Sequence, residues 1–486
     1  MSERQVNPWL VLCLVCIAQF MVILDATIVN VALPSIQADL NMAEADLQWV
    51  VNSYTLIFGG FLLLGGRAGD LIGRKRVFLA GLVVFTVASF LNGIADSSTF
   101  LILARGLQGL GAALVAPAAL SILTTTFEAG EQRAKALGVW AAIAPGGAAV
   151  GLLLGGILVE FLSWPWIFFV NVPVGIAAFV ASMIYVPESR ADAEHRIFDI
   201  PGAVTVTAGL VALVYGIVNV QEAGWTSAST LFWGALALVL LTAFVLIEQR
   251  QKAPLVRLGI FAVRTLRAAN VTMLLVASGL FAMFFFNTLY VQRVLGYTPL
   301  EAGLAFLPVT VGIAIGAGLS QPLVKRLGIR TTSMIGMTLG TIGMLLLVTS
   351  DANGSYLGDV LLGLAPVSVG MGLTFVPVTL LATSGIDRED AGLASGLFNT
   401  SQQIGGALGL AILSTLAVNR TENALGGLPG APTPVQQGEA LVSGFHAAYV
   451  GGALFFLAGI VVMLTLLRRS DEEQVDLERP MTELAA

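Results

Sequence analysis

The sequence predicts an all-α membrane protein with fourteen transmembrane helices, arranged as two six-helix bundles with two further helices inserted between them. Apolar residues make up 56% of the 486 residues and charged residues only 11%, against about 25% charged residues in an average soluble domain. Apolar runs of about 20 residues recur along the chain, and each is long enough to cross about 30 Å of hydrocarbon as a helix. A water-soluble fold could not bury this much apolar surface.

The apolar runs define the predicted spans, with boundaries that are accurate to a few residues. The spans are residues 9–33, 47–66, 77–95, 99–126, 134–161, 166–186, 200–220, 230–247, 268–291, 302–324, 331–349, 357–384, 391–418 and 443–467. The predicted organisation is an N-terminal segment (1–8), a first six-helix bundle (9–190), two inserted helices (200–250), a second six-helix bundle (251–467) and an acidic tail (468–486).

The basic residues indicate how the helices are oriented. If both termini lie in the cytoplasm, 21 of the 24 Lys and Arg residues fall in cytoplasmic segments. Only Arg293 and Arg420 fall outside, and Arg105 lies within a span. Because loops on the cytoplasmic side are enriched in Lys and Arg, this asymmetry predicts a multi-pass membrane protein with both termini inside.

A weak internal repeat relates the two predicted bundles. Three glycines of the fifth span have counterparts in the thirteenth at one constant offset of 258 residues: Gly138, Gly147 and Gly151 against Gly396, Gly405 and Gly409. The basic loop with Gly73 and Lys75 recurs as Gly328 and Arg330. Repeated halves around a site near the membrane midplane are a recurrent plan of transporters.

Two charged residues stand well inside the predicted spans. Asp25 lies about 12 Å and Arg105 about 9 Å from the outer face, at 1.5 Å per helical residue, so their depths nearly match. A charge within hydrocarbon costs about 2.5–3.5 kcal/mol even on lenient scales, which makes such residues functional candidates. We expect Asp25 and Arg105 to meet in one cavity, where burial favours the neutral acid and the guanidinium favours the anion. A change in their separation could then bind and release a proton; a static structural pair is the alternative.

Three more residues share a helix face with Arg105, at spacings of three, four and seven residues: Gln108, Gly109 and Ala112. We expect Gln108 and Gly109 to belong to a helix-packing motif, in which Gly109 and Ala112 form a stripe of small residues.

The loop at residues 66–76 carries five candidate gating residues: Gly66, Asp70, Gly73, Arg74 and Arg76. Its glycines permit a tight turn. The carboxylate of Asp70 can accept hydrogen bonds from a helix N-terminus, where negative charge is favoured. Such a contact between the two bundles would form in one conformation and break in another. An ordinary cytoplasmic loop would explain the arginines but not the acid.

Several stretches resemble motifs of the major facilitator superfamily. Residues 66–76 are similar to the signature loop of that family, and residues 24–34 (Leu24-Asp25-Ala-Thr27-Ile-Val-Asn30-Val-Ala-Leu-Pro34) resemble the first-helix motif of its fourteen-helix drug:proton antiporters. Residues 105–112 resemble the fourth-helix motif associated with proton coupling. Further similar stretches are residues 171–175, 292–308 and 394–409. The resemblance implies a monomeric exporter in which Asp25 and Arg105 couple transport to protons.

The fifth span resembles the antiporter motif of this family, with Gly147, Gly151, Gly155 and Gly156 as helix-packing positions. The sequence departs from the family pattern in two places, since Leu152 and Pro165 stand where the family usually has proline and arginine. Pro145 lies about two helical turns before Leu152 and could supply the missing bend.

A substrate cavity is expected between the two bundles, near the midplane. Polar and aromatic residues of four spans are its predicted lining: Asn30, Tyr54, Phe284, Asn287, Asn399 and Gln403. An aromatic wall with few polar groups suits lipophilic guests. Neither residues 268–291 nor the tenth span contains an acid, so substrates with two fixed positive charges should fit poorly.

The remaining motifs limit the alternatives. No Gly-Lys pair occurs in the sequence, so a phosphate-binding loop for ATP is absent and an ion gradient is the expected energy source. Cys13 and Cys16 are expected to be apolar packing residues, and His195 and His446 have no ligand cluster at suitable spacing, so we expect neither metal nor cofactor. No basic patch with interleaved aromatic residues indicates nucleic acid. The expected function is proton-coupled export of small lipophilic molecules. Uptake of a small solute is the nearest alternative, followed by an intramembrane enzyme and a receptor.

Overall fold

A computed structural model describes residues 7–127, 130–190, 199–252, 254–384, 386, 390–428 and 431–468. All regular elements of this part of the chain are helices, which confirms the all-α prediction. Most of the predicted N-terminal segment and nearly all of the acidic tail lie outside the described residues. In chain order the helices are α1 (Pro8–Leu40), α2 (Glu44–Leu47), α3 (Trp49–Ile72), α4 (Arg74–Gly93), α5 (Ser98–Thr126), α6 (Glu131–Phe161), α7 (Trp166–Phe169), α8 (Asn171–Tyr185), α9 (Ile200–Ala223), α10 (Ala228–Arg250), η1 (Leu258–Ala262), α11 (Arg264–Leu289), η2 (Tyr290–Val294), α12 (Pro299–Ala305), α13 (Leu307–Leu347), η3 (Tyr356–Leu361), α14 (Leu362–Thr383), α15 (Ala391–Gly426) and α16 (Pro434–Leu466).

Local sequence signals set many of these boundaries. The side chain of Asn7 accepts a hydrogen bond from the Trp9 amide at the start of α1, which satisfies one of the free amides of a first turn. Thr298 and Glu301 form a capping box at the start of α12. Gly73, with φ of 124°, separates α3 from α4, because a residue with a side chain would be strained there.

Thirteen helices in the described residues are long and apolar enough to span a membrane. The prediction of fourteen differs from this count at a single place, where the candidate span Pro299–Leu347 covers both the tenth and the eleventh predicted spans. Its main helix, α13, has 41 residues, or about 60 Å at 1.5 Å per residue, which is about twice the thickness of the hydrocarbon. Gly328 interrupts it with a φ of 84°. The break favours two spans, although the count of fourteen stays a prediction.

The glycine repeat reappears as repeated packing. Cβ atoms at Gly147 and Gly151 of α6 would contact Ile23 and Thr27 of α1. Their counterparts on α15, Gly405 and Gly409, face Leu274 and Ser278 of α11. Both contacts share one register, because Leu274 and Ser278 each lie 251 positions after the α1 residue that they match. The same register places Val276 at the position that corresponds to Asp25.

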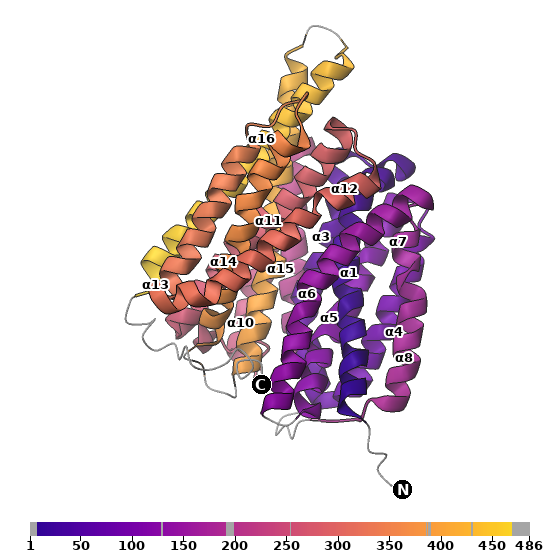
Figure 1. The fold of residues 1–486 in the computed structure, drawn as a ribbon, viewed down its shortest axis with the longest axis vertical. Coiled ribbons are helices and arrows are strands. Elements are labelled where there is room, and N and C mark those ends of the chain that lie inside the picture. Colours follow the sequence, from indigo (N-terminus) through magenta and orange to yellow (C-terminus); the bar gives the residue numbers. More distant parts are fainter. Residues whose placement is uncertain are drawn as a thin grey trace.

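The helices form two groups with the inserted pair at one side (Figure 1). α9 packs against both groups. A Cβ at Gly60 of α3 would meet Thr207 of α9, and Thr415 of α15 donates to the carbonyl of Ile217, 3.3 Å away. α10 packs mainly on α9 and exposes large apolar side chains such as Leu238 and Val239, as expected of a surface that contacts lipid.

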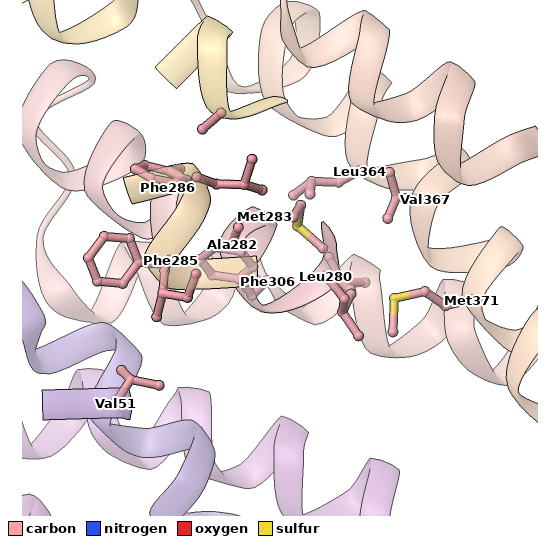
Figure 2. Packing of buried hydrophobic residues seen from close by; sticks show 14 of the residues in the cluster. Val51, Leu280, Ala282, Met283, Phe285, Phe286, Phe306, Leu364, Val367 and Met371 are labelled. Carbon is pink, nitrogen blue, oxygen red and sulfur yellow. The ribbon is translucent and has the colours of Figure 1, made fainter. Parts of the chain in front are cut away.

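The larger apolar core includes many residues of the second group of helices and extends into α1, α3 and α7 of the first group. Figure 2 shows Leu280 and Met283 of α11 facing Leu364, Val367 and Met371 of α14. Phe286 packs on Phe445 of α16. The stretch of α11 that corresponds to the Asp25 region of α1 consists of apolar and neutral polar residues, and it contains no charged side chain.

Candidate proton-coupling site

Asp25 of α1 lies in the interior, with no exposed surface. Three donors hold its carboxylate: Arg105 Nη1 at 2.6 Å from Oδ2, and Gln108 Nε2 at 2.7 Å and Asn171 Nδ2 at 2.9 Å from Oδ1. A buried carboxylate requires such partners, because an unpaired ion in a low-dielectric interior is costly. The expected meeting of Asp25 and Arg105 is therefore a direct ion pair in this structure.

Arg105 of α5 connects three helices, and only 1% of its surface is exposed. Its Nε donates to the Val50 carbonyl oxygen of α3 at 3.0 Å, and Nη1 donates both to Asp25 and to Gln108 Oε1 at 2.6 Å. The ring of Tyr54 lies 4.4 Å from the guanidinium carbon and that of Phe168 lies 5.6 Å away. Both distances suit cation–π attraction.

Gln108 was expected to act as a helix-packing residue. Instead, its side-chain amide makes four hydrogen bonds at the centre of the Asp25 network. Its Oε1 accepts from Arg105 and from Asn92 Nδ2 at 2.7 Å, and its Nε2 donates to Asp25 and to Ser89 Oγ at 2.6 Å. The amide therefore uses both ends, as a buried Gln must if its groups are to be satisfied.

Sequence reasoning did not identify Ser89, Asn92 and Asn171. All three are buried neutral residues of α4 and α8. A search for neutral polar residues within apolar spans could have found them, because such groups also need partners in hydrocarbon. The search for charges alone missed them.

Glycines allow the helices of this site to approach closely. A Cβ at Gly109 of α5 would clash with the carbonyl oxygen of Tyr54 in α3, and one at Gly151 of α6 would clash with Thr27 in α1. Gly109 and Gly151 thus hold the packing positions expected of them. The first contact brings Tyr54 over Arg105, and the second supports α1 close to Asp25.

This arrangement stabilises the anionic form of Asp25, because every contact to its oxygens comes from a donor. A proton on Oδ2 would compete directly with the guanidinium, so protonation requires that the Asp25–Arg105 contact lengthen or exchange partners. The network is thus chemically able to link the binding of a proton to a relative movement of α1 and α5.

The five candidate gating residues contact their own half of the protein, whereas Arg67 of the same loop donates to the Pro254 carbonyl oxygen. Asp70 accepts a hydrogen bond from Arg74 Nη2 at 3.1 Å. Within the described residues, Asp70 therefore pairs with a neighbouring arginine and not with a helix N-terminus of the other bundle. Arg76 Nε lies 3.5 Å from Glu188, which also accepts from the Lys75 amide. Gly66 lies close to Pro117 of α5, and a Cβ at Gly73 would meet Glu188.

The four glycines of α6 that were expected at helix-packing positions separate into two groups. Gly147, Gly151 and Gly155 face α1, where a Cβ at Gly155 would lie 2.9 Å from Ile28. Gly156 faces α12 instead, and its Cβ would lie 2.7 Å from both Leu300 Cα and the Pro299 carbonyl oxygen. α6 continues through Pro145 as one helix.

The six expected cavity residues do not share one environment. Tyr54 and Asn287 have at most 2% of their surface exposed, so they line no accessible cavity in this conformation, contrary to expectation. Tyr54 packs on Arg105 because cation–π contact and the apolar interior favour the ring there, and Asn287 donates to the Met283 carbonyl of its own helix.

The other four expected cavity residues are at least partly accessible. Asn30 and Asn399 donate to carbonyls one turn back in α1 and α15. Phe284 packs on Phe306, with ring centroids 5.7 Å apart, and Gln403 packs against Gly59 of α3.

Within the described residues, no group of three or more His, Cys, Asp or Glu side chains is arranged to hold a metal ion. Cys13 and Cys16 are free thiols. His446 contacts Ser350, with Nε2 2.9 Å from the carbonyl oxygen, whereas His195 lies outside the described residues.

A bundle of apolar helices with a buried, fully hydrogen-bonded ion pair defines a polytopic membrane transporter. Residues 15–410 match the Major Facilitator Superfamily, and the chain belongs to this family.

Named relatives cover nearly the whole chain. The sequence is 42% identical to the cephamycin export protein CmcT of Amycolatopsis lactamdurans, over 94% of this chain and 93% of that protein. It is 38% identical to the puromycin resistance protein pur8 of Streptomyces alboniger, over 94% and 90%. It is 35% identical to the tetracenomycin C resistance and export protein of Streptomyces glaucescens, over 85% and 77%.

Solved structures share the fold at low sequence identity. A bacterial homologue of the human lysosomal transporter Spinster superposes with a TM-score of 0.64 at 16% identity, over 96% of this chain and 99% of that chain. The peptide transporter POT gives a TM-score of 0.65 at 15% identity, over 94% and 95%. These likenesses confirm the major facilitator fold.

Proposed function

We propose that the protein exports small lipophilic drugs, antibiotics or toxic metabolites in exchange for protons, as a monomer in the bacterial plasma membrane. The observation that carries the proposal is the Asp25–Arg105 pair with its amide donors, because it offers one titratable group held between movable helices. The relatives named for export of or resistance to cephamycin, puromycin and tetracenomycin C support the substrate class. Each proton that enters is worth about 2.3 kcal/mol per 100 mV, or about a fifty-fold gradient.

The topology of this proposal has fourteen spans, cytoplasmic termini and two six-helix bundles, residues 9–190 and 251–467, with residues 200–250 inserted. The positive-inside pattern and the break at Gly328 support it. Parallel repeats of this kind surround a midplane substrate site in related architectures.

Contacts between the bundles support alternating access. At one end, Glu160 of α6 accepts from the Leu300 amide at 3.0 Å, and Gln292 donates to the Val31 carbonyl at 2.9 Å. Towards the other end of α6, Cβ atoms at Gly138 and Gly146 would meet nothing within 4 Å. We infer that the outer ends are closed here and that the inner half of α6 moves against the second bundle during transport.

The test is efflux of ethidium from energised cells that express the wild type, Asp25→Asn or the exposed control Asp96→Asn, with and without a protonophore. We expect efflux by the wild type and the control, and loss of efflux in Asp25→Asn and in uncoupled cells. Unchanged efflux by Asp25→Asn would remove Asp25 from the mechanism. Absence of wild-type efflux would point to a narrower substrate or to uptake.

A further inference from the structure

A second pair of acidic side chains lies at the inserted helices, away from Asp25. Asp199 is the N-terminal cap of α9, and Glu248 lies in the last turn of α10. The two helices form an antiparallel hairpin, so the start of α9 and the end of α10 meet. Both residues are buried, with 0% and 4% of their surface exposed.

One oxygen of each carboxyl group is satisfied by the backbone. The Gly202 amide donates to Asp199 Oδ1 at 2.8 Å, and Gln251 Nε2 lies 3.3 Å from the same atom. The Val256 amide donates to Glu248 Oε2 at 3.0 Å. The second oxygens, Asp199 Oδ2 and Glu248 Oε1, are buried without a hydrogen-bond donor in the described residues.

The two unsatisfied oxygens face each other. A Cβ at Gly202 would lie 2.7 Å from each of them, so the two oxygens are no more than twice that distance apart, and neither has a hydrogen-bond partner in the described residues. A single proton between these oxygens would satisfy both, since a protonated carboxyl donates where a carboxylate only accepts.

Neither carboxyl has a counter-ion in the described part of the chain, where no Lys or Arg forms an ion pair with Asp199 or Glu248. The basic residues of the surrounding elements have other contacts or lie at the surface. Arg67 of α3 donates to the Pro254 carbonyl at 3.4 Å, and Arg257 pairs with Asp390. Arg250 and Lys252 are exposed, and Arg264 and Arg267 of α11 are paired with neither acid. Two adjacent buried carboxylates cannot both ionise at low cost, so such pairs titrate as a unit that retains one proton.

We propose that Asp199 and Glu248 form a second proton-binding site, which holds one proton between their facing oxygens. Glu248 also accepts a hydrogen bond from the Val256 amide. Arg67, in the loop at residues 66–76, donates to the Pro254 carbonyl oxygen. The proton therefore stabilises the segment that joins the inserted helices to the second bundle. Loss of the proton would place two anions side by side and loosen this segment. The link to gating rests on the proposed transport function, whereas proton binding does not.

Infrared difference spectroscopy of the full-length protein in lipid tests the site. The background carries Asp25→Asn, so that Asp25 contributes no carboxylic acid signal. At neutral pH we expect the C=O stretch of a buried protonated carboxyl. This band should be lost in Glu248→Gln and in Asp199→Asn, and kept in Glu131→Gln, which changes an exposed carboxyl. Absence of the band in the background, or its survival in both pair variants, would overturn the proposal.

Two further readouts separate the explanations. Hydrogen exchange of a peptide that includes Val256 is expressed as protection relative to the intrinsic exchange rate at each pH. This protection should fall as the pH rises in the background and should not change with pH in Glu248→Gln; equal pH dependence of the protection in both would contradict the site. Loss of the band on addition of Na⁺ at constant pH would identify a metal-cation site instead. The band in the Asp25→Asn background together with no efflux by the wild type would count against the proposed function and leave the proton site standing. Efflux by the wild type without the band in the background would do the opposite.

Discussion

Arg105 Nη1 lies 2.6 Å from Asp25 Oδ2, although the two residues are 80 positions apart in the chain. The same nitrogen also contacts Gln108, and Nε holds the Val50 carbonyl. The guanidinium therefore fixes the positions of α1, α3 and α5 at once, so any change in the charge of Asp25 must alter how these helices pack.

Replacement of Arg105 by lysine should abolish coupled efflux, because one ammonium group cannot reproduce the planar set of donors. Arg105→Gln should also destabilise the protein by about 3–5 kcal/mol, since it leaves a buried carboxylate without its counter-ion. Thermal unfolding in detergent and dye efflux measure both effects. The double variant Asp25→Asn/Arg105→Gln should regain stability without regaining efflux. Full efflux by Arg105→Lys would contradict this role.

Loss of an amide donor should matter more than loss of an acceptor beside it. Asn171→Leu removes a hydrogen bond to the charged carboxylate, which is worth about 1.5–3 kcal/mol, and should reduce efflux about tenfold or more. Ser89→Ala removes a hydroxyl that does not contact Asp25, so its effect should be smaller. Initial rates of efflux at matched expression give the order, and an equal or reversed order would exclude the donor role of Asn171.

Close packing at Gly109 should be sensitive to a single methyl group. Gly109→Ala places a Cβ against the Tyr54 carbonyl oxygen, and overpacking of this kind typically costs about 1–3 kcal/mol. Gly138→Ala is the matched control, because nothing lies within 4 Å of its Cβ. Thermal unfolding should separate the two variants, and similar stability for both would show that α3 and α5 can move apart.

The contact between α6 and α12 should open during transport. Cysteines in place of Glu160 and Leu300 should form a disulfide, because the Glu160 side chain reaches the Leu300 amide, 3.0 Å away, and disulfides join side chains of closely spaced backbones. Cys13→Ala and Cys16→Ala remove the native thiols. Oxidation should block efflux and reduction should restore it. Efflux that continues in the oxidised protein would mean that this contact stays closed throughout the cycle.

Substrates with two fixed positive charges should be transported poorly. The described part of α11 contains no acid, and the register of the repeat places Val276 where α1 has Asp25. A dication would therefore find no buried counter-charge on this side of the interface, and the desolvation of its charges would be uncompensated. Competition for ethidium efflux by monocations and dications of similar size tests this expectation; equal competition would contradict it.

The sequence alone was sufficient for the fold class, the family and the positions of most spans, because long apolar runs in lipid permit little besides helices. It also singled out Asp25 and Arg105, since their charge is conspicuous within apolar helices. The glycine spacing predicted the repeat that recurs in the contacts of Gly151 and Gly409. Basic residues on both sides of Gly328 indicated two separate spans, and the structure interrupts the helix at this glycine.

Only the tertiary structure decided which neutral side chains join the ion pair. Gln108, Asn171 and Ser89 come from three helices, and their convergence depends on helix rotation and crossing, which apolar runs do not encode because nearly all faces of such helices are apolar. For the same reason Tyr54 and Asn287, expected at a cavity, are buried against their own halves. The facing oxygens of Asp199 and Glu248 likewise follow from how α9 folds back on α10. The apolar composition of a segment determines whether it forms a helix in the membrane. Contacts between segments that are distant in the sequence determine which side chains share a proton.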